Sequence, residues 1–547
     1  MPWLACLAGV LLVFHPSLFS GLKDLQLGWG DPRLLTYLFE HTWLWVTRAP
    51  LHTEFWSPPI MYPALGTGPY TDTILGAAPM YWAFRGVGFA EAPSMVLWLI
   101  GASVLNFWAA WMFLTRILGV RTLAATAGAF LFGFGITRAA NVSSPQMLAA
   151  FYGMFGMVAL GRALQLAGTE RPGGMRVLRC LVLASVLMVL QAWSAFYNAF
   201  FYLLVLGVAL AVALTMREGR RAIGRLLRRH VVAIVVALVV GLLLLRPLLV
   251  AQLGSITSGG VRNLQHIHRS LADLTSWIDP GLSHWLYGDL VRFTHTSSAS
   301  QHVNGVGFVT MLVALIGLVM GRRRLIVRVA ALSTAVVVVL MTRWPNGFSL
   351  WFEIVEAVPL LRSVRYSARI GEFLVIPAGI GLALVVEGLV ERRRVLPAAL
   401  LVLLCAAEQG HFVNGRPNAV YEDAIDALAA QVDPDCETFF IQSYDARPPD
   451  EPRPRKIHEK VTHIAAMWVG IRTGKPTING NMGQQPRGWK MVRADVDPHP
   501  SPDDKHTVTQ ETLDAQLQRW VENKRLDPER ICRITAPAAE LPWYLLP

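Results

Sequence analysis

The fold of this 547-residue chain is decided by residues 231–250, which read VVAIVVALVVGLLLLRPLLV. This stretch carries a single charge, and a hydrocarbon core about 30 Å thick is crossed by a helix of about 20 such residues. Six arginines stand directly before it, within the sequence REGRRAIGRLLRR at 217–229. Arginine-rich loops beside an apolar span usually face the cytoplasm. The stretch therefore predicts a transmembrane helix whose N-terminal end faces the cell interior.

The composition of the whole chain is that of a membrane protein. It is 53% hydrophobic and 16% charged, whereas soluble domains are about 45–50% apolar and about 25% charged. The apolar residues come in long runs, which excludes a soluble enzyme, a disordered chain and a secreted disulfide scaffold. Residues 1–407 hold 32 Lys and Arg against 16 Asp and Glu, and residues 408–547 hold 17 against 21. The basic charge thus belongs to the hydrophobic part, where it indicates membrane topology and no nucleic-acid partner.

Eleven apolar segments are long enough for a membrane span or come close to it. They lie near residues 2–20, 93–115, 122–137, 147–166, 177–193, 195–215, 231–253, 305–321, 327–342, 373–391 and 395–407. If the N-terminus is cytoplasmic, 19 of the 32 cations fall in short inside loops with four acids beside them, which is the regime where the positive-inside rule is reliable. We therefore expect the segments 21–92, 254–304 and 343–372, and the tail 408–547, to lie outside. Residues 2–20 lack the basic n-region and Ala-x-Ala site of a cleaved signal peptide, which remains the alternative for that segment.

These patterns predict an all-α polytopic membrane bundle of about 11 transmembrane helices in residues 1–407 and a small extracytoplasmic α/β domain in residues 408–547. In the tail we expect a helix at 420–431, a strand at 436–441, a proline-rich loop at 445–457, and a second helix behind a capping box formed by Thr507 and Gln510. The tail shows no metal-spaced Cys/His cluster, phosphate-binding glycine loop or nucleophile elbow, which favours a packing or lid role. Cys436 and Cys532 form either a disulfide or two free thiols.

The segment 21–92 contains two acids that are candidates for chemistry. A connection of about 70 residues is far longer than the usual 4–6 and is often functional, and its many aromatic residues suit the membrane interface. Its candidate acids are Asp31 and Asp72. Each has a structural alternative, because Asp31-Pro32 is also a typical helix start with Asp as N-cap, and Thr71-Asp72 is a typical cap for the next helix.

Several short motifs follow one another along most of the chain. They are Gly30-Asp31, Tyr62-Pro63, YTDTILG at 70–76, FGFGITR at 132–138, SPQM at 144–147, RSVRYSAR at 362–369, PTING at 476–480 and PRGW at 486–489. Their order resembles the GT-C superfamily of polytopic glycosyltransferases, and within it an uncharacterised bacterial branch related to YfhO-type membrane proteins. One departure is Ser144, since the related pattern usually has His-x-Gln there. Gln146 is in place.

The resemblance implies sugar transfer with inversion from a polyprenyl-phosphate-linked donor to a glycan, lipid or protein acceptor, at the outer side of a bacterial cytoplasmic (inner) membrane. It implies Asp31 as catalytic base, and Asp72 as a residue that orients the acceptor, assists as a second acid or helps to hold a divalent cation. Mg²⁺ or Mn²⁺ is one option and no metal the other, because no dedicated cage is visible. The resemblance further implies five substrate-binding residues, Tyr70, Arg138, Gln146, Arg365 and Arg369.

Arg365 and Arg369 are expected to bind the leaving phosphate. At a spacing of four they share a face if a helix contains both, and the planar guanidinium fork suits phosphate oxygens. We expect them to lie near Asp31 and Asp72 at an outward-facing cavity. Their alternative roles are to face anionic lipid headgroups or to pair with acids of the same region, Glu353, Glu356 or Glu372.

Two other function classes compete with the enzyme. A lipid or glycan transporter or flippase also needs many spans, and such proteins commonly carry buried charge near the midplane. A non-catalytic membrane assembly protein is the third reading, because fold resemblance alone does not establish activity. Few charged residues interrupt the apolar spans of this chain, and its polar residues gather in the predicted outside loops, which favours the glycosyltransferase.

Overall fold

The computed structural model describes residues 1–25, 28–140, 142, 144–169, 173–258, 264–291, 302–412, 415–444, 457–491, 510–537 and 541–542. Residues 445–456 of the predicted proline-rich loop and Thr507 of the predicted capping box lie outside this set. The chain forms two compact units, which we describe separately. Unit 1 comprises Met1–Phe19, Val96–Pro247 and Arg262–Asn414, and unit 2 comprises Ser20–Met95, Leu248–Val261 and Gly415–Pro547.

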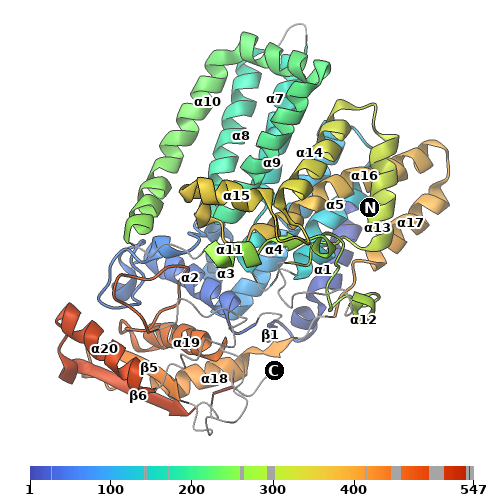
Figure 1. Ribbon diagram of the computed structural model, residues 1–547. Helices are drawn as coiled ribbons and strands as arrows, with labels where there is room; N and C mark the ends of the chain where they lie inside the picture. Colours follow the sequence, from blue (N-terminus) through green and yellow to red (C-terminus); the bar gives the residue numbers. More distant parts are fainter. Residues whose placement is uncertain are drawn as a thin grey trace. The chain divides into compact units, whose positions relative to one another are not determined.

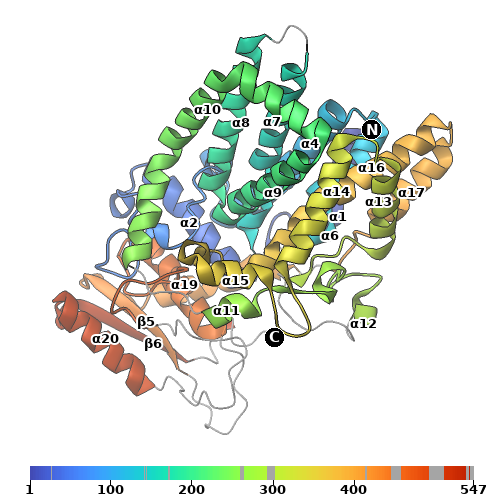
Figure 2. The same ribbon diagram turned by 45° about the horizontal axis from the view of Figure 1, so that its top comes forward.

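The described residues are mostly helical, and unit 1 is a bundle of apolar helices (Figure 1). Its long helices are α1 (Pro2–Phe19), α4 (Glu91–Phe113), α5 (Thr122–Phe134), α7 (Phe151–Ala167), α8 (Gly174–Ser194), α9 (Phe196–Thr215), α10 (Arg217–Ser258), α13 (Phe308–Met320), α14 (Leu325–Met341), α16 (Val375–Glu391) and α17 (Val395–Ala407). The first residues of α4 and the last of α10 belong to unit 2. Helix α8 packs against both α7 and α9, and Figure 2 shows these three side by side.

The predicted spans coincide with apolar helices. Among the described residues, eight helical segments are long and apolar enough to cross a membrane, namely Pro2–Phe19, Glu91–Leu118, Thr122–Ala140, Pro145–Ala167, Gly174–Ser194, Phe196–Thr215, Arg217–Ser255 and Ser367–Glu391. Three shorter apolar helices, α13, α14 and α17, lie where the other three spans are expected. The chain is therefore a multi-pass membrane protein. The count of eleven crossings and their orientation stay predictions.

Close helix packing in unit 1 depends on glycine. Helix α16 packs against both α5 and α13. A Cβ atom at Gly317 would lie 1.8 Å from the carbonyl oxygen of Gly381, and one at Gly128 would lie 2.4 Å from that of Gly379. Small residues at such positions let membrane helices approach each other closely, and so support association where the hydrophobic effect does not drive it. The glycines of α16 therefore hold two neighbouring helices of the bundle together.

Unit 2 combines the tail with the segment that follows the first span. Its helices are α2 (Asp31–Val46), α3 (Ala78–Gly86), α18 (Asn418–Ala429), α19 (Ile457–Thr473) and α20 (Gln510–Lys524). Strands β5 (Thr438–Tyr444) and β6 (Ile531–Pro537) pair in parallel, and β1 (Asp24–Leu25) pairs antiparallel with β4 (Arg416–Pro417). Helix α19 packs against α18, β5 and α2. The predicted tail helix and strand thus exist as α18 and β5, whereas the domain division at 407/408 stays a prediction.

The remaining elements of unit 1 are short. They are α6 (Ile136–Ala140), α11 (Leu264–Arg269), α12 (Gly288–Val291), α15 (Leu350–Ala357) and the parallel pair of β2 (Ala272–Asp273) with β3 (Thr342–Arg343). Three 3₁₀ helices matter for the site, η5 (Pro145–Leu148), η8 (Pro359–Ser363) and η9 (Ser367–Leu374). Gln146 lies in η5 and Arg369 in η9, two of the five predicted substrate-binding residues.

A disulfide joins the two parallel strands of the tail. Cys436 stands two residues before β5 and Cys532 is the second residue of β6, and their Cα atoms lie 5.8 Å apart. Within the pair, Phe439 is the register partner of Cys532. Of the two alternatives that the sequence left open for these cysteines, the structure has the disulfide.

Candidate functional site

Asp31 is the first residue of α2 and bonds to the tail. The N-cap of α2 is Gly30 and makes no side-chain capping bond, so the alternative that Asp31 is the N-cap is wrong by one position. The Asp31 carboxylate accepts a hydrogen bond from Nζ of Lys460 in α19 and forms an ion pair with it. The two side chains are 40% and 39% exposed. A carboxylate predicted to act as a base is therefore open to solvent and held by a cation from the other end of the chain.

Asp72 follows the 3₁₀ helix η2 (Gly68–Tyr70) in an irregular segment. The next helix, α3, begins at Ala78 and has Ala77 as its N-cap, so the capping alternative for Asp72 is also wrong. Tyr70 is 6% exposed, and Gln252 donates to the carbonyl oxygen of Thr71 at 3.5 Å. The catalytic role of Asp72 and the binding role of Tyr70 stay predictions.

The acids and histidines of the described residues do not form a metal cage. No group of three or more His, Cys, Asp or Glu side chains gathers anywhere in the part of the chain that the structure describes. An oxygen of Asp31 faces the ammonium group of Lys460. A dedicated divalent-cation site needs several converging oxygen ligands. The described residues do not fit such a site.

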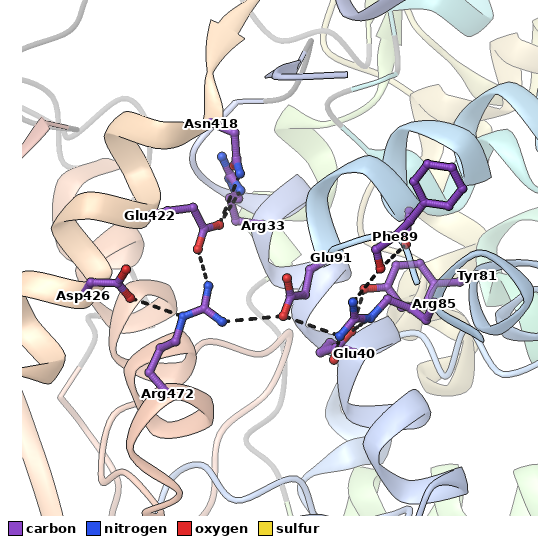
Figure 3. Close-up of polar contacts among 11 residues, drawn as sticks. Arg33, Glu40, Tyr81, Arg85, Phe89, Glu91, Asn418, Glu422, Asp426 and Arg472 are labelled. Carbon is purple, nitrogen blue, oxygen red and sulfur yellow. Dashed lines mark hydrogen bonds and ion pairs between the residues drawn. The ribbon is translucent and has the colours of Figure 1, made fainter. Parts of the chain in front are cut away.

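An ion-pair network ties the tail helices to the segment 21–92 (Figure 3). Arg472 of α19 contacts Glu91 at 3.5 Å, Asp426 at 3.3 Å and also Glu422. Burial lowers the pKa of Arg472, but the three carboxylates outweigh this effect, and the pKa is raised overall. The guanidinium group stays charged, and it fixes the end of α19 against α18 and the start of α4.

A second part of the same network surrounds Glu40. Arg85 donates to both carboxylate oxygens of Glu40 at 2.9 Å, and Tyr81 donates to one of them at 2.8 Å (Figure 3). Burial raises the pKa of Glu40, and these hydrogen bonds oppose the rise in part. Arg85 also lies 3.6 Å from Glu91. The helices α2 and α3 are thereby linked to the Arg472 part of the network, which positions Asp31 at the start of α2.

Unit 1 contains a buried charged cluster that includes three predicted substrate-binding residues. Arg138, at the end of the third span, is 1% exposed and donates to Glu372 at 2.8 Å and to the carbonyl oxygen of Met147 at 3.1 Å. Its Nε and Nη2 atoms have no hydrogen-bond partner among the described residues. The Glu372 side chain is fully buried. One carboxylate thus satisfies only part of the Arg138 guanidinium group.

Arg365 and Arg369 come together in a different way from the one predicted. Arg365 lies between η8 and η9, and η9 starts at Ser367, so no helix contains both. Instead, their guanidinium carbons lie 4.2 and 4.8 Å from the ring centroid of Tyr366, which stands between the two in sequence. The Nε atoms of both arginines are buried and, within the described residues, lack partners. The side chain of Tyr366 brings the two cations together where no helical face does.

Ser144 contacts the same cluster, and Gln146 lies two residues further along the chain. Ser144, which stands where the related pattern has His, accepts a hydrogen bond from Arg369 Nη2 at 2.8 Å. Gln146 is in η5, and in the described part of the chain its Oε1 atom is buried without a partner. Asn198 of α9 donates to the carbonyl oxygen of Met147 at 2.9 Å. The position of the missing His is therefore occupied by a hydroxyl group that orients Arg369.

The cluster defined by Arg138, Arg365, Arg369 and Glu372 contains three cations and one anion. Burying a guanidinium N–H without a partner costs free energy, and unsatisfied buried polar groups are rare enough to need an explanation. An anion with several oxygens supplies the missing acceptors and balances the charge. The arrangement fits a phosphate better than a neutral ligand. Sequence reasoning named the arginines, and named Glu372 as an alternative partner of Arg365 and Arg369, but it missed Tyr366 and the pairing of Glu372 with Arg138.

Comparisons with known proteins place the fold. No protein-family model matches the chain, and no curated protein matches its sequence. The crystal structure of the Archaeoglobus fulgidus oligosaccharyltransferase in complex with Zn and sulfate is similar, with a TM-score of 0.50, 13% identity, and coverage of 88% of this chain and 62% of that one. The same enzyme tethered with an acceptor peptide containing the NVT sequon gives a TM-score of 0.52, 10% identity, and coverage of 95% and 67%. This chain therefore shares the fold of that oligosaccharyltransferase.

This shared fold supports the predicted resemblance to the GT-C superfamily, and the comparisons do not support the narrower likeness to a YfhO-type branch. The chain spans less than two thirds of the length of the oligosaccharyltransferase in its complex with Zn and sulfate. At this level of identity the likeness concerns the GT-C fold.

Proposed function

We propose that this protein is an integral-membrane glycosyltransferase that moves a sugar from a polyprenyl-phosphate-linked donor to an extracytoplasmic acceptor. The observation that carries the proposal is the cluster of Arg138, Arg365 and Arg369, whose buried N–H groups have no partner among the described residues and suit phosphate oxygens. The GT-C fold, and the acceptor peptide of the similar oligosaccharyltransferase, support it. The relationship to a YfhO-type branch rests on the sequence motifs alone.

The reaction needs a base for the acceptor and cations for the leaving group. The acceptor hydroxyl oxygen bonds to the anomeric carbon while the bond from that carbon to the phosphate oxygen breaks. The phosphate leaves with the electron pair, and the hydroxyl proton passes to the Asp31 carboxylate. One displacement inverts the configuration and needs one base. The arginines stabilise the charge that grows on the phosphate, while Gln146, Tyr70 and Asp72 are assigned to substrate binding and orientation.

The proposed sidedness rests on charge and on the disulfide. The arginine-rich short loops favour the cytoplasmic side for every second connection, which puts the N-terminus inside and the tail outside. A disulfide between Cys436 and Cys532 supports this orientation, because such bonds persist in oxidising compartments. We propose that the protein lies in a bacterial cytoplasmic membrane, with the tail on the outer face of that membrane.

A flippase for the same lipid is the second candidate. The observation that favours it is the charge buried within membrane-spanning helices, because Arg138 and Glu372 both lie in segments long enough to cross the bilayer, and intramembrane charges often mark a transport path. A flippase would bind the same phosphate but would break no glycosidic bond. The two candidates therefore differ in the product and not in the ligand.

The test uses the full-length protein in vesicles of phosphatidylethanolamine and phosphatidylglycerol. A panel of polyprenyl-phosphate-linked hexoses and pentoses, radiolabelled in the sugar, is added, and release of polyprenyl phosphate is measured beside movement of the intact lipid across the bilayer. Asp31→Asn should lower the rate of release by about 10²–10⁴-fold. The control Asp423→Asn, on an exposed position of α18, should retain it. The proposal is contradicted if Asp31→Asn releases polyprenyl phosphate at the wild-type rate. It is also contradicted if the intact lipid moves across the bilayer while neither the wild type nor a variant releases polyprenyl phosphate.

A further inference from the structure

The ion pair between Asp31 and Lys460 connects a predicted catalytic base with the tail. The two residues are 429 positions apart in the sequence, and the tail itself carries no catalytic motif. Both side chains are about 40% exposed, so a substrate hydroxyl has access to the carboxylate. Exposed ion pairs often contribute little to stability, so the main consequence expected of this pair is its effect on the charge and orientation of the carboxylate.

Buried contacts fix where Lys460 lies. Trp468, two turns further along α19, donates from its ring nitrogen to the carbonyl oxygen of Arg33 at 3.3 Å, and its ring packs edge-on against Tyr37 with centroids 5.9 Å apart. Trp468 is 3% exposed. Lys460 precedes Trp468 by eight residues, slightly more than two turns of α19. The register of α19 along α2 is therefore set by packing, and it places Lys460 at the first residue of α2.

Arg33, a cation close to Asp31 in the sequence, is turned to a different partner. Arg33, two residues after Asp31, is 2% exposed, and its guanidinium carbon lies 4.2 Å from the ring centroid of Tyr421. It is 3.9 Å from Glu422 of α18. Burial lowers the pKa of Arg33, and Tyr421 and Glu422 oppose this effect. Arg33 thus helps to join α2 to α18, whereas Lys460 contacts the Asp31 carboxylate.

We propose that Lys460 is a positioning residue for the base, so that the C-terminal tail contributes directly to the active site. This rests on the proposed function of Asp31. The ammonium group holds the carboxylate in one orientation and favours its ionised form, the form that accepts the proton of the acceptor hydroxyl. After the transfer, the same charge favours release of that proton to solvent and restores the base. Lys460 itself forms no bond to the sugar or the acceptor.

The test compares Lys460→Met, Lys460→Arg and Lys490→Met in the full-length protein, in the vesicle assay described above. Lys490 is an exposed lysine of the same tail and serves as the matched control. For Lys460→Met we expect kcat to fall about tenfold, the size of one charge-assisted hydrogen bond, and the acid limb of the pH–rate profile to move to higher pH. Lys460→Arg keeps the charge and should recover most of the rate and the original profile. A general loss of folding would lower activity without moving the pH profile.

The outcomes separate this inference from the proposed function. If Asp31→Asn is inactive while Lys460→Met keeps the wild-type rate and pH profile, Lys460 is not a positioning residue and the proposed function stands. If Lys460→Met and Lys460→Arg lose the same activity with an unchanged pH profile, the role of Lys460 is structural, which also overturns the inference. If Asp31→Asn is fully active, both proposals fail together.

Discussion

Arginines of the two units differ in their burial and in how fully their N–H groups are paired. In unit 1, Arg138 and Arg369 are 1% and 7% exposed and keep buried N–H groups that no described residue accepts. In unit 2, the side chain of Arg472 is 30% exposed and contacts three carboxylates. In Arg33 of unit 2, Nε is the one buried side-chain nitrogen that lacks a hydrogen-bond partner among the described residues. Exposed arginines that are paired with carboxylates suit a role in folding. Buried arginines with N–H groups that lack acceptors suit the binding of a ligand whose oxygens accept those hydrogen bonds.

The largest effect is expected at Arg138. Replacing it by Met leaves the fully buried Glu372 carboxylate without its ion-pair partner, and breaking one side of a buried pair costs about 3–5 kcal/mol. We expect the free energy of unfolding of the full-length protein in detergent to fall by this amount. Chemical denaturation followed by tryptophan fluorescence measures it.

Two further variants sharpen that result. Arg322→Met, at an exposed loop position, should change the free energy of unfolding by no more than about 0.5 kcal/mol. The double variant Arg138→Met/Glu372→Leu should recover most of the lost stability, because replacing both members of a buried pair by apolar residues is often neutral. It should still fail to release polyprenyl phosphate. A double variant that regains activity would show that the cluster does not bind the donor.

An intermediate effect on stability is expected from protonation of His463, a buried side chain of unit 2 whose two ring nitrogens both form hydrogen bonds. Its Nδ1 atom accepts hydrogen bonds from Asn479 Nδ2 at 3.1 Å and from the Gly480 amide at 3.4 Å, and Nε2 donates to the Met491 carbonyl oxygen at 3.3 Å. The ring is thus neutral, and burial lowers its pKa to about 4. The unfolded chain binds a proton below a pH of about 6.5. Stability is therefore complete above that pH and falls as the pH drops from 6.5 towards 4, by about 2 kcal/mol at pH 5.

The His463→Gln variant isolates this contribution. Other buried histidines of unit 2, such as His41 and His52, also have lowered pKa values, because burial disfavours their charged forms. They are present in both proteins, so the difference in pH dependence between the wild type and the variant reports His463 alone. Thermal unfolding midpoints measured between pH 7.5 and pH 5 give this difference. Equal slopes for the two proteins would mean that His463 is not buried in its neutral form.

The sequence predicted features that are encoded within a short stretch of residues, and it missed contacts between residues far apart along the chain. The apolar spans and their arginine-rich loops are local patterns, and all eleven coincide with apolar helices. Arg138, Arg365 and Arg369 were named from motifs, and the fold brings them beside residues such as Ser144 and Tyr366. The contact of Asp31 with Lys460 was not predictable, because it joins residues 429 positions apart through the packing of α19 on α2. No spacing rule records such a contact, and no motif marks Lys460.

The smallest effect is expected at Arg472, although it makes more ion pairs than Arg138. Its partners Glu91, Glu422 and Asp426 are 18%, 24% and 64% exposed, so water stabilises them when the arginine is removed. Exposed pairs are worth up to about 1 kcal/mol, and Arg472→Met should cost about that amount at low salt. Since salt screens such charges over about 3 Å at 1 M, the difference from the wild type should shrink in 1 M NaCl, whereas that of Arg138→Met should persist. Arg519→Met, on the exposed side of α20, is the control. A loss at Arg472 as large and as salt-resistant as that at Arg138 would mean that exposure does not separate the two units, and the case for a ligand in the buried cluster would weaken with it.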